Sequence, residues 1–289
     1  MIWFLQTAVG GLSIGAVYAL VALGFSIVYR TMGLVNFAHA DVVMIGAYVT
    51  VTFFLTARLP FGVALVLAVV LTGALGVGIE RVLRPLESRD LNLMLIGTIG
   101  FGIVLESVAI LVWGSTGTAV PAPIPNVPLH AGGVVVTTYQ LLIVAVSAVV
   151  MGMLYLFLDR TKVGTAMQAA AMDRVAATAM GVNVGASNAL AFGIGSAIAA
   201  VAGAMVGPLL YVSPGMGASI GIKGFAAAIL GGFGNIPGAI AGGLIFGLIE
   251  SFSSGQLSAY SDLVTFVVFA AAMVLRPTGI FGERTADRA

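Results

Sequence analysis

Two short polar segments interrupt long apolar stretches and could hold a small ligand within a membrane protein. The first runs from Gly33 to Asp41 and the second from Gly231 to Gly238. Gly and Pro destabilise a helix interior by about 1 and about 3 kcal/mol, so the second segment predicts a broken or re-entrant helix. Transporters often bind substrate at such breaks, where free N–H groups attract anionic groups. The residues expected to line a substrate pathway are therefore Asn36, His39, Asp41, Gly231, Gly232, Gly234, Asn235 and Pro237.

Each segment also has a plainer interpretation. The Gly231–Gly238 segment could be a simple turn between two helices. The Asn36–Asp41 segment could be a surface loop in which Asn36 or Asp41 caps a helix. The sequence leaves both interpretations open.

Ionisable groups inside the apolar stretches are few. Glu106 and Glu250 are carboxylates in such stretches, where a charge is normally paired or functional. An isolated Glu is more often an interhelical hydrogen-bond anchor than a transport residue. The scarcity of these groups argues against ion-coupled, self-powered transport.

Catalytic and metal-binding patterns are missing from the sequence. It has no cysteine, and its histidines, His39 and His130, are isolated. It contains no G-x-x-x-x-G-K-[ST] phosphate-binding loop, no H-E-x-x-H pair and no G-x-S-x-G elbow. We therefore expect no catalytic residue, no metal site and no cofactor, and we expect any ATP hydrolysis to occur on separate chains.

A charged segment, Asp159–Arg174, separates two uncharged stretches of membrane-spanning length. Beyond Gly164, the run Thr165–Met180 is rich in Ala and Met, which are strong helix formers, and Gly181 should end the helix. One helix face would carry Ala169, Met172, Ala176 and Ala179. A partner could dock on this face, because small side chains fit a groove and Met adapts to the surface that it meets. The alternative is a solvated connector.

The composition places the chain in a membrane. It is 60% hydrophobic and 8% charged, whereas soluble domains are about 25% charged. Hydrocarbon about 30 Å thick needs about 20 apolar residues per helix, which gives about eight spans, and the apolar start at Met1 indicates a retained first span. The expected spans are Phe4–Tyr29, Val42–Ala57, Phe61–Ile79, Leu91–Trp113, Tyr139–Leu158, Ala189–Val212, Phe225–Phe252 and Ala259–Leu275.

Basic residues indicate the orientation, because loops rich in Lys and Arg stay in the cytoplasm. Three groups hold nine of the twelve basic residues. The first two groups agree in side, and the proline-rich Gly114–Thr138 between them is expected to be extracytoplasmic and extended. The third group lies on the same side of the membrane as the other two only if Phe225–Phe252 is not one ordinary helix. The groups are Arg81, Arg84 and Arg89; Arg160, Lys162 and Arg174; and Arg276, Arg284 and Arg288.

Small residues recur every four positions in three of these stretches. This spacing lets membrane helices approach closely, which predicts a compact bundle, with packing inside the chain as the ordinary interpretation and an oligomer as the other. The stripes are Gly11, Gly15 and Ala19; Gly195, Ala199, Gly203 and Gly207; and Ala239, Gly243 and Gly247.

Three blocks of the sequence resemble the membrane permeases of branched-chain amino-acid ABC importers, in the shorter of that system's two permease types. The blocks are Gly10–Leu20 with Gly33–Tyr48, the loop Thr161–Val184, and Lys223–Gly243. One departure is visible: the family usually has Gly where this chain has Ala40, which narrows the allowed backbone angles.

The resemblance implies one permease domain over residues 1–289, an all-α, type II ABC importer-like bundle in a bacterial inner membrane. It implies a second, homologous permease, two cytoplasmic ATPases and a periplasmic binding protein as partners. Residues 159–185 would form the cytoplasmic coupling loop, and the substrates would be leucine, isoleucine and valine. The implied ATPase-coupling residues are Thr165, Gln168, Ala169, Ala170, Ala171, Asp173, Arg174 and Gly181.

Other functions remain compatible with the sequence. Relatives within the same family import urea, short-chain amides or other neutral amino acids. A self-sufficient secondary carrier or channel, and a membrane scaffold that transports nothing, are the alternatives from other classes.

Overall fold

The computed structural model describes residues 2–87, 90–256 and 260–282. Within them, seven helices are long and apolar enough to cross a membrane, and two apolar helices, α9 and α11, are shorter. The expected bundle of about eight membrane helices is confirmed, with α11 as the short last one. The elements are α1 (Ile2–Met32), α2 (Ala38–Val51), η1 (Thr52–Thr56), α3 (Phe61–Glu87), α4 (Leu91–Trp113), β1 (Pro128–Ala131), β2 (Val134–Thr137), α5 (Thr138–Arg160), α6 (Lys162–Met172), α7 (Arg174–Ala179), α8 (Val184–Val206), α9 (Met216–Gly231), α10 (Ile236–Gln256) and α11 (Ser261–Leu275).

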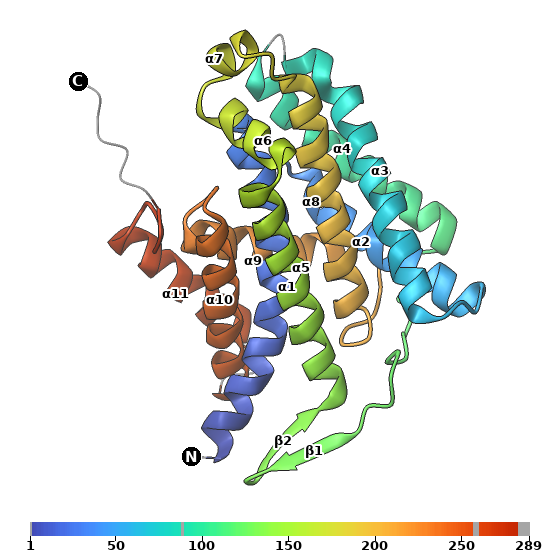
Figure 1. Cartoon of the computed structure of the whole chain (residues 1–289). Coiled ribbons are helices and arrows are strands. Elements are labelled where there is room, and N and C mark those ends of the chain that lie inside the picture. Colours follow the sequence, from blue (N-terminus) through green and yellow to red (C-terminus); the bar gives the residue numbers. More distant parts are fainter. Residues whose placement is uncertain (1, 88–89, 257–259, 283–289) are drawn as a thin grey trace.

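The two ends of the bundle differ in charge. At one end, α1, α3 and α5 finish beside α6 and α7, and Arg30 donates a hydrogen bond to Gln168 (3.1 Å). We call it the basic end, because Arg84, Arg160 and Lys162 also lie there (Figure 1). The other, hairpin end holds the start of α1 and the strands β1 and β2. The described members of the first two basic groups thus share one side of the bundle, as predicted.

Two of the small-residue stripes pack directly against each other. α10 runs antiparallel to α1, and a Cβ added to Gly243 would overlap Ala19. One turn further along α10, a Cβ at Gly247 would overlap Gly15. These stripes therefore serve packing within the chain, since only very small residues allow backbones this close.

Helix α8 lies at the centre, against α1, α2 and α3. Its own stripe makes these contacts: Gly195 faces Gly24 of α1, and Gly203 faces Val43 and Ala47 of α2. On the third side, a Cβ at Gly76 of α3 would overlap Ser196. The core is thus built on glycine contacts that hold α1, α2 and α3 around α8.

The expected span Phe225–Phe252 is two helices, which confirms the predicted discontinuity. α9 ends at Gly231, and α10 starts at Ile236 beside the basic end of α1. Because the chain reverses between α9 and α10, α10 runs toward the hairpin end and α11 then runs back toward the basic end. There Ile280 and Phe281 donate backbone hydrogen bonds to Leu230 and Gly231 (2.8 and 3.0 Å). Arg276 thereby joins the other basic residues, whereas Arg89, Arg284 and Arg288 lie outside the described residues.

The segment Gly114–Thr138 differs from the expected extended loop. It contains the antiparallel hairpin β1–β2, whose turn residues Gly132 and Gly133 both have positive φ (58° and 87°), as a tight hairpin turn requires. Gln6 of α1 binds both backbone groups of Val135 (2.7 Å each). The hairpin thus fastens the start of α1 at the end opposite the basic residues.

The predicted single helix Thr165–Met180 is wrong. The chain breaks at Asp173, which is extended (φ −153°, ψ 107°) between α6 and α7. Its carboxylate accepts hydrogen bonds from the backbone N–H groups of Val175 and Ala176 (2.9 and 3.0 Å), which is ordinary capping by Asp. The expected common face of Ala169, Met172, Ala176 and Ala179 is therefore divided between two helices. Gly181, with φ 86°, follows α7 as predicted.

Candidate functional site

The first break, which we define as residues 33–41, lies inside the bundle. The Asn36 side chain is 1% exposed, and α2 has no side-chain N-cap hydrogen bond, so the interpretation as a capped surface loop is wrong. The Asn36 Oδ1 atom has no hydrogen-bond partner in the described part of the chain. The Phe37 N–H is held by Thr98 Oγ1 of α4 (3.1 Å). Asn36 therefore presents a buried, unused amide oxygen.

His39 is fully buried beside Gly24 of α1. A Cβ at Gly24 would overlap the imidazole, and the ring packs edge-on against Phe25 (centroids 4.7 Å apart). Neither ring nitrogen makes a hydrogen bond of standard geometry to a described residue, although the Val21 carbonyl faces the ring. His39 is thus a second buried polar side chain in this break, with the Val21 carbonyl as a neighbour and at least one ring nitrogen unused.

Asp41 lies one turn into α2, between α4 and α9. A Cβ at Gly102 of α4 would overlap its carboxylate, and a Cβ at Gly217 of α9 would lie 3.0 Å from Oδ1. Glu106, one turn beyond Gly102, is close enough to interact electrostatically with Asp41. Two carboxylates from α2 and α4 thus approach each other where glycine leaves room.

Ala40 shows how the chain accommodates its departure from the family pattern. A Cβ added to Gly221 of α9 would overlap the Ala40 methyl group. Alanine therefore fits at position 40 because α9 has glycine at the facing position. The first break and α9 are in backbone contact here.

The second break, which we define as residues 231–238, lies nearer the basic end. A Cβ at Gly234 would lie 3.2 Å from the Tyr29 ring, whereas the first break meets α1 at Gly24, about 8 Å deeper at 1.5 Å per residue. Asn235 caps α10: Oδ1 accepts from the Gly238 N–H (2.9 Å), and Nδ2 donates to the Phe281 carbonyl (3.1 Å). Pro237 occupies the first turn of α10, where the missing N–H costs nothing.

Aromatic rings connect the two breaks. Phe37 of the first break packs against Phe225 of α9, and Phe225 packs against Phe233 of the second break (centroids 5.8 and 5.5 Å apart). Phe233 also packs on Tyr29 of α1 (4.5 Å), and Phe225 on Phe25 (5.5 Å). This cluster could not be predicted from the sequence, because it is assembled from four separate segments.

The predicted coupling residues lie in α6 and α7 or directly next to them in the chain, at the basic end. Thr165, Asp173 and Gly181 are exposed, whereas Ala170 is buried against its own chain. Gln168 fixes α6 by donating to the Leu158 carbonyl of α5 and accepting from Arg30 of α1. The half-buried residues are Gln168, Ala169, Ala171 and Arg174.

Arg174 ties this loop to the bundle. One guanidinium nitrogen pairs with Glu87 of α3 (2.6 Å), and another donates to the Met32 carbonyl of α1 (3.1 Å). Asn188 of α8 donates to both Glu87 oxygens (3.2 Å each). A movement of α7 would therefore act on α1, α3 and α8 together.

One charged cluster was missed from the sequence. The Lys223 ammonium of α9 contacts Glu250 of α10 (2.5 Å) and Asp262 of α11 (2.9 Å). Glu250 is therefore paired and is not the isolated anchor considered above. The opposite charges of Lys223 and Glu250 in neighbouring apolar stretches were the available signal, since buried charges are normally paired.

These features describe a multi-pass membrane protein with a broken helix and a projecting loop at its basic end. Residues 7–273 match the family described as "Branched-chain amino acid transport system / permease component". The chain therefore belongs to this family of transport permeases. It is similar over 99% of its length to BraD of Pseudomonas aeruginosa and to LivH of Escherichia coli K12, both high-affinity branched-chain amino acid transport system permease proteins, with 37% identity and 98% of each relative covered.

A more distant relative and a solved structure are also similar to this chain. A probable branched-chain amino acid transport permease protein LivH of Methanocaldococcus jannaschii is 26% identical over 91% of this chain and 88% of that protein. Among solved structures, PsaBC from Streptococcus pneumoniae in complex with Fab aligns with a TM-score of 0.50 at 17% identity, covering 96% of this chain and 94% of that one. That likeness concerns the fold alone, and it agrees with the type II importer-like bundle that the resemblance predicts.

Proposed function

We propose that this chain is the membrane-spanning permease subunit of an ATP-driven importer of leucine, isoleucine and valine in a bacterial inner membrane. Its partners would be a second, homologous permease, two cytoplasmic ATP-binding subunits and a periplasmic binding protein. ATP hydrolysis would take place on the ATP-binding subunits. The observation that carries the coupling part of this proposal is the exposure of large apolar side chains on the α6–α7 loop.

This exposed surface consists of Met172, Val175 and Met180, which are 88%, 82% and 85% exposed. The three side chains belong to the loop that Arg174 joins to the last residues of α1 and α3, so we place them at the cytoplasmic ends of these helices, outside the hydrocarbon. Apolar side chains that project from a charged loop fit a protein groove, and Met adapts to its shape. We assign this surface to the ATP-binding subunit, with Thr165, Asp173 and Gly181 at its polar edge.

The movement of the ATPases would reach the membrane helices through Arg174. Its bonds to Glu87 and to the Met32 carbonyl connect α7 to α3 and α1. The Met32 carbonyl lies next to the first break, and the aromatic cluster leads from that break to the second. A displacement of α7 would thus change both breaks together.

Substrate contact is assigned to the first break. An amino acid carries an ammonium group, which can donate hydrogen bonds to the Asp41 carboxylate and to the unused Asn36 Oδ1 atom. Phe25, Phe37 and Phe225 offer apolar surface for a branched aliphatic side chain. The second break, whose amide groups are occupied, would act as the joint that lets α9 and α10 move.

The test is a reconstituted complex of permease, ATP-binding subunits and binding protein. Changing Met172 and Val175 to Glu should abolish co-purification of the ATP-binding subunits and ATP-driven leucine uptake, because both new charges would be buried in the interface. The control is Val127→Glu, an exposed apolar residue at the hairpin end. Normal co-purification of the double variant would refute the coupling surface.

A substrate panel separates the remaining functions. Leucine, isoleucine and valine should be taken up, and urea and acetamide should not. Uptake by the permease alone without ATP would assign a carrier or channel instead. A complex that transports none of these compounds would favour a scaffold.

A further inference from the structure

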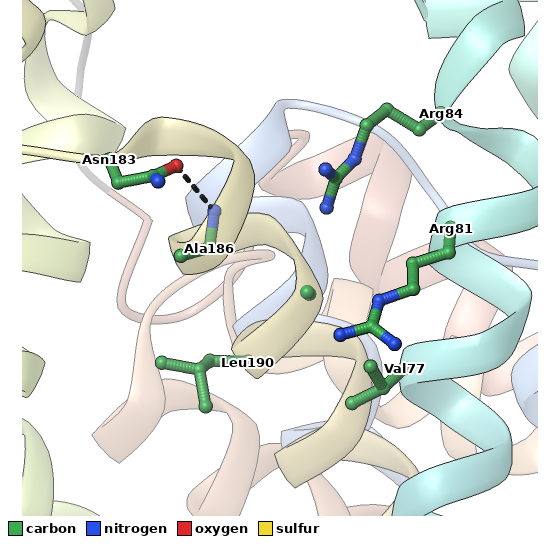
Figure 2. Close-up of a pocket in the computed structure, with 7 residues that line it drawn as sticks. Val77, Arg81, Arg84, Asn183, Ala186 and Leu190 are labelled. Carbon is green, nitrogen blue, oxygen red and sulfur yellow. Dashed lines mark hydrogen bonds between the residues drawn. The ribbon is translucent and has the colours of Figure 1, made fainter.

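A cavity of about 440 Å³ lies between α3 and α8 at the basic end, and the proposed transport cycle does not use it. Two arginines of α3, Arg81 and Arg84, extend into it from one side (Figure 2). The facing wall on α8 is formed by Ala189, Leu190 and the start of the helix at Asn183. The cavity is thus basic on one wall and largely apolar on the other.

The two arginines differ in charge balance. Arg84 makes two hydrogen bonds to the buried Glu80 carboxylate (2.9 and 2.8 Å) and one to the Gly185 carbonyl (3.0 Å). Arg81, one turn earlier, has no ion pair or hydrogen bond to any residue in the three described ranges. The cavity therefore contains one uncompensated positive charge, on Arg81.

The depth of the cavity matches the edge of a bilayer. Arg81 lies about 30 Å along α3 from Phe61, at 1.5 Å per residue, and the hydrocarbon core is about 30 Å thick. Outward residues of the same helix, such as Val70 and Val82, are exposed and apolar. An arginine at this position lies at the level of lipid phosphates.

The shape of the cavity follows from the packing below it. α3 and α8 are in tight contact at Gly76, where a Cβ would overlap Ser196 and the Phe192 carbonyl. Toward the basic end, the larger Val77, Arg81 and Leu190 side chains line the space between the helices. The result is a wedge with an apolar floor and a charged rim.

We propose that this wedge binds an anionic phospholipid of the cytoplasmic leaflet. Arg81 would pair with the phosphate group, and the Asn183 amide nitrogen would donate to it, since Asn183 Oδ1 is occupied by the Ala186 N–H (3.0 Å). An acyl chain would lie over Val77 and Leu190. Basic pockets between membrane helices on the cytoplasmic side suit anionic head groups in charge and depth.

The experiment compares lipid retention by three variants of the complex. The complex is extracted from vesicles of phosphatidylglycerol and phosphatidylcholine, and retained lipid is counted by native mass spectrometry. Arg81→Gln should lower phosphatidylglycerol retention about fivefold, and Ala189→Phe should lower it by filling the cavity with all charges kept. The control Arg160→Gln removes an equal charge from an exposed arginine at the same end and should change nothing.

Several results would overturn the proposal. Equal losses in Arg81→Gln and Arg160→Gln would mean unspecific attraction to the basic end. Unchanged lipid retention in a folded Ala189→Phe variant would exclude the cavity as the binding site. If the Ala189→Phe variant does not fold, Arg81→Gln still tests the site, because the Arg81 side chain is exposed. Displacement of the lipid by excess inorganic phosphate would assign a free-anion site. If the permease alone retains the lipid but the complex does not, the cavity would be assigned to an acidic side chain of a partner subunit.

Discussion

The two breaks each place an asparagine just before a helix, yet the structure uses these residues differently. At the second break, Asn235 binds a backbone N–H with its oxygen and a backbone carbonyl with its nitrogen. At the first break, the Asn36 oxygen is buried without a partner in the described chain, and neither His39 ring nitrogen makes a hydrogen bond of standard geometry there. One break is a satisfied joint, whereas the other holds unused polar groups.

The difference indicates which break can exchange partners during transport. A buried polar atom without a hydrogen bond costs about 1–3 kcal/mol, and such atoms are rare in folded proteins. A substrate that binds them removes that cost. A satisfied cap, in contrast, stabilises the fold and offers nothing to a ligand.

The largest expected effect comes from the glycines of the two breaks. Gly232 (φ 107°) and Gly33 (φ 68°) both have backbone angles that favour glycine, and Ala there costs about 1–3 kcal/mol. A Cβ at Gly232 would also lie 2.6 Å from the Gly282 nitrogen, whereas Gly33 has open space. Gly232→Ala should therefore lower the melting temperature in detergent more than Gly33→Ala. Equal losses would contradict the tight packing of the second break.

The contact between Ala40 of the first break and Gly221 of α9 gives the second prediction. Gly221→Ala should destabilise the protein by about 1–3 kcal/mol, because its methyl group would overlap that of Ala40. Adding Ala40→Gly should restore most of the loss in thermal unfolding. The control is Gly78→Ala on α3, where a Cβ has open space and alanine favours the helix. A double variant no more stable than Gly221→Ala would show that this contact is not the cause.

The cap at the second break gives a smaller effect. Asn235→Ala should cost about 1 kcal/mol of stability, because it removes the N-cap of α10. Thermal unfolding of the purified permease measures it. Stability equal to that of the unchanged chain would mean that the cap does not hold α10.

Much of the fold could be predicted from the sequence because the membrane imposes simple rules. The span Leu91–Trp113 was predicted with the bounds of α4, since an uninterrupted apolar run of this length has few alternatives. The conflict between the third basic group and a continuous Phe225–Phe252 helix correctly predicted the discontinuity. Charge and length thus determined the topology.

The details of the site could not be predicted, because they depend on contacts between distant segments. Asp173 breaks an otherwise helical run by capping α7, and residue propensity alone favours a continuous helix there. The ion pair of Lys223 and Glu250 needs the reversal between α9 and α10. Asn36 is buried in a loop whose next residue, Phe37, is held by Thr98 of α4 and packs on Phe225 of α9, and local patterns do not record such contacts.

The most direct test compares Asn36→Ala with Asn235→Ala in the reconstituted complex, measuring ATP-driven leucine uptake and the melting temperature of each. We predict opposite profiles: Asn36→Ala should lower uptake about tenfold or more at nearly unchanged stability, since it loses a charge-assisted contact to substrate but no hydrogen bond of the fold, and Asn235→Ala should lower stability while uptake per folded complex remains. Normal uptake by Asn36→Ala, with a folded complex, would contradict the assignment of substrate contact to the first break.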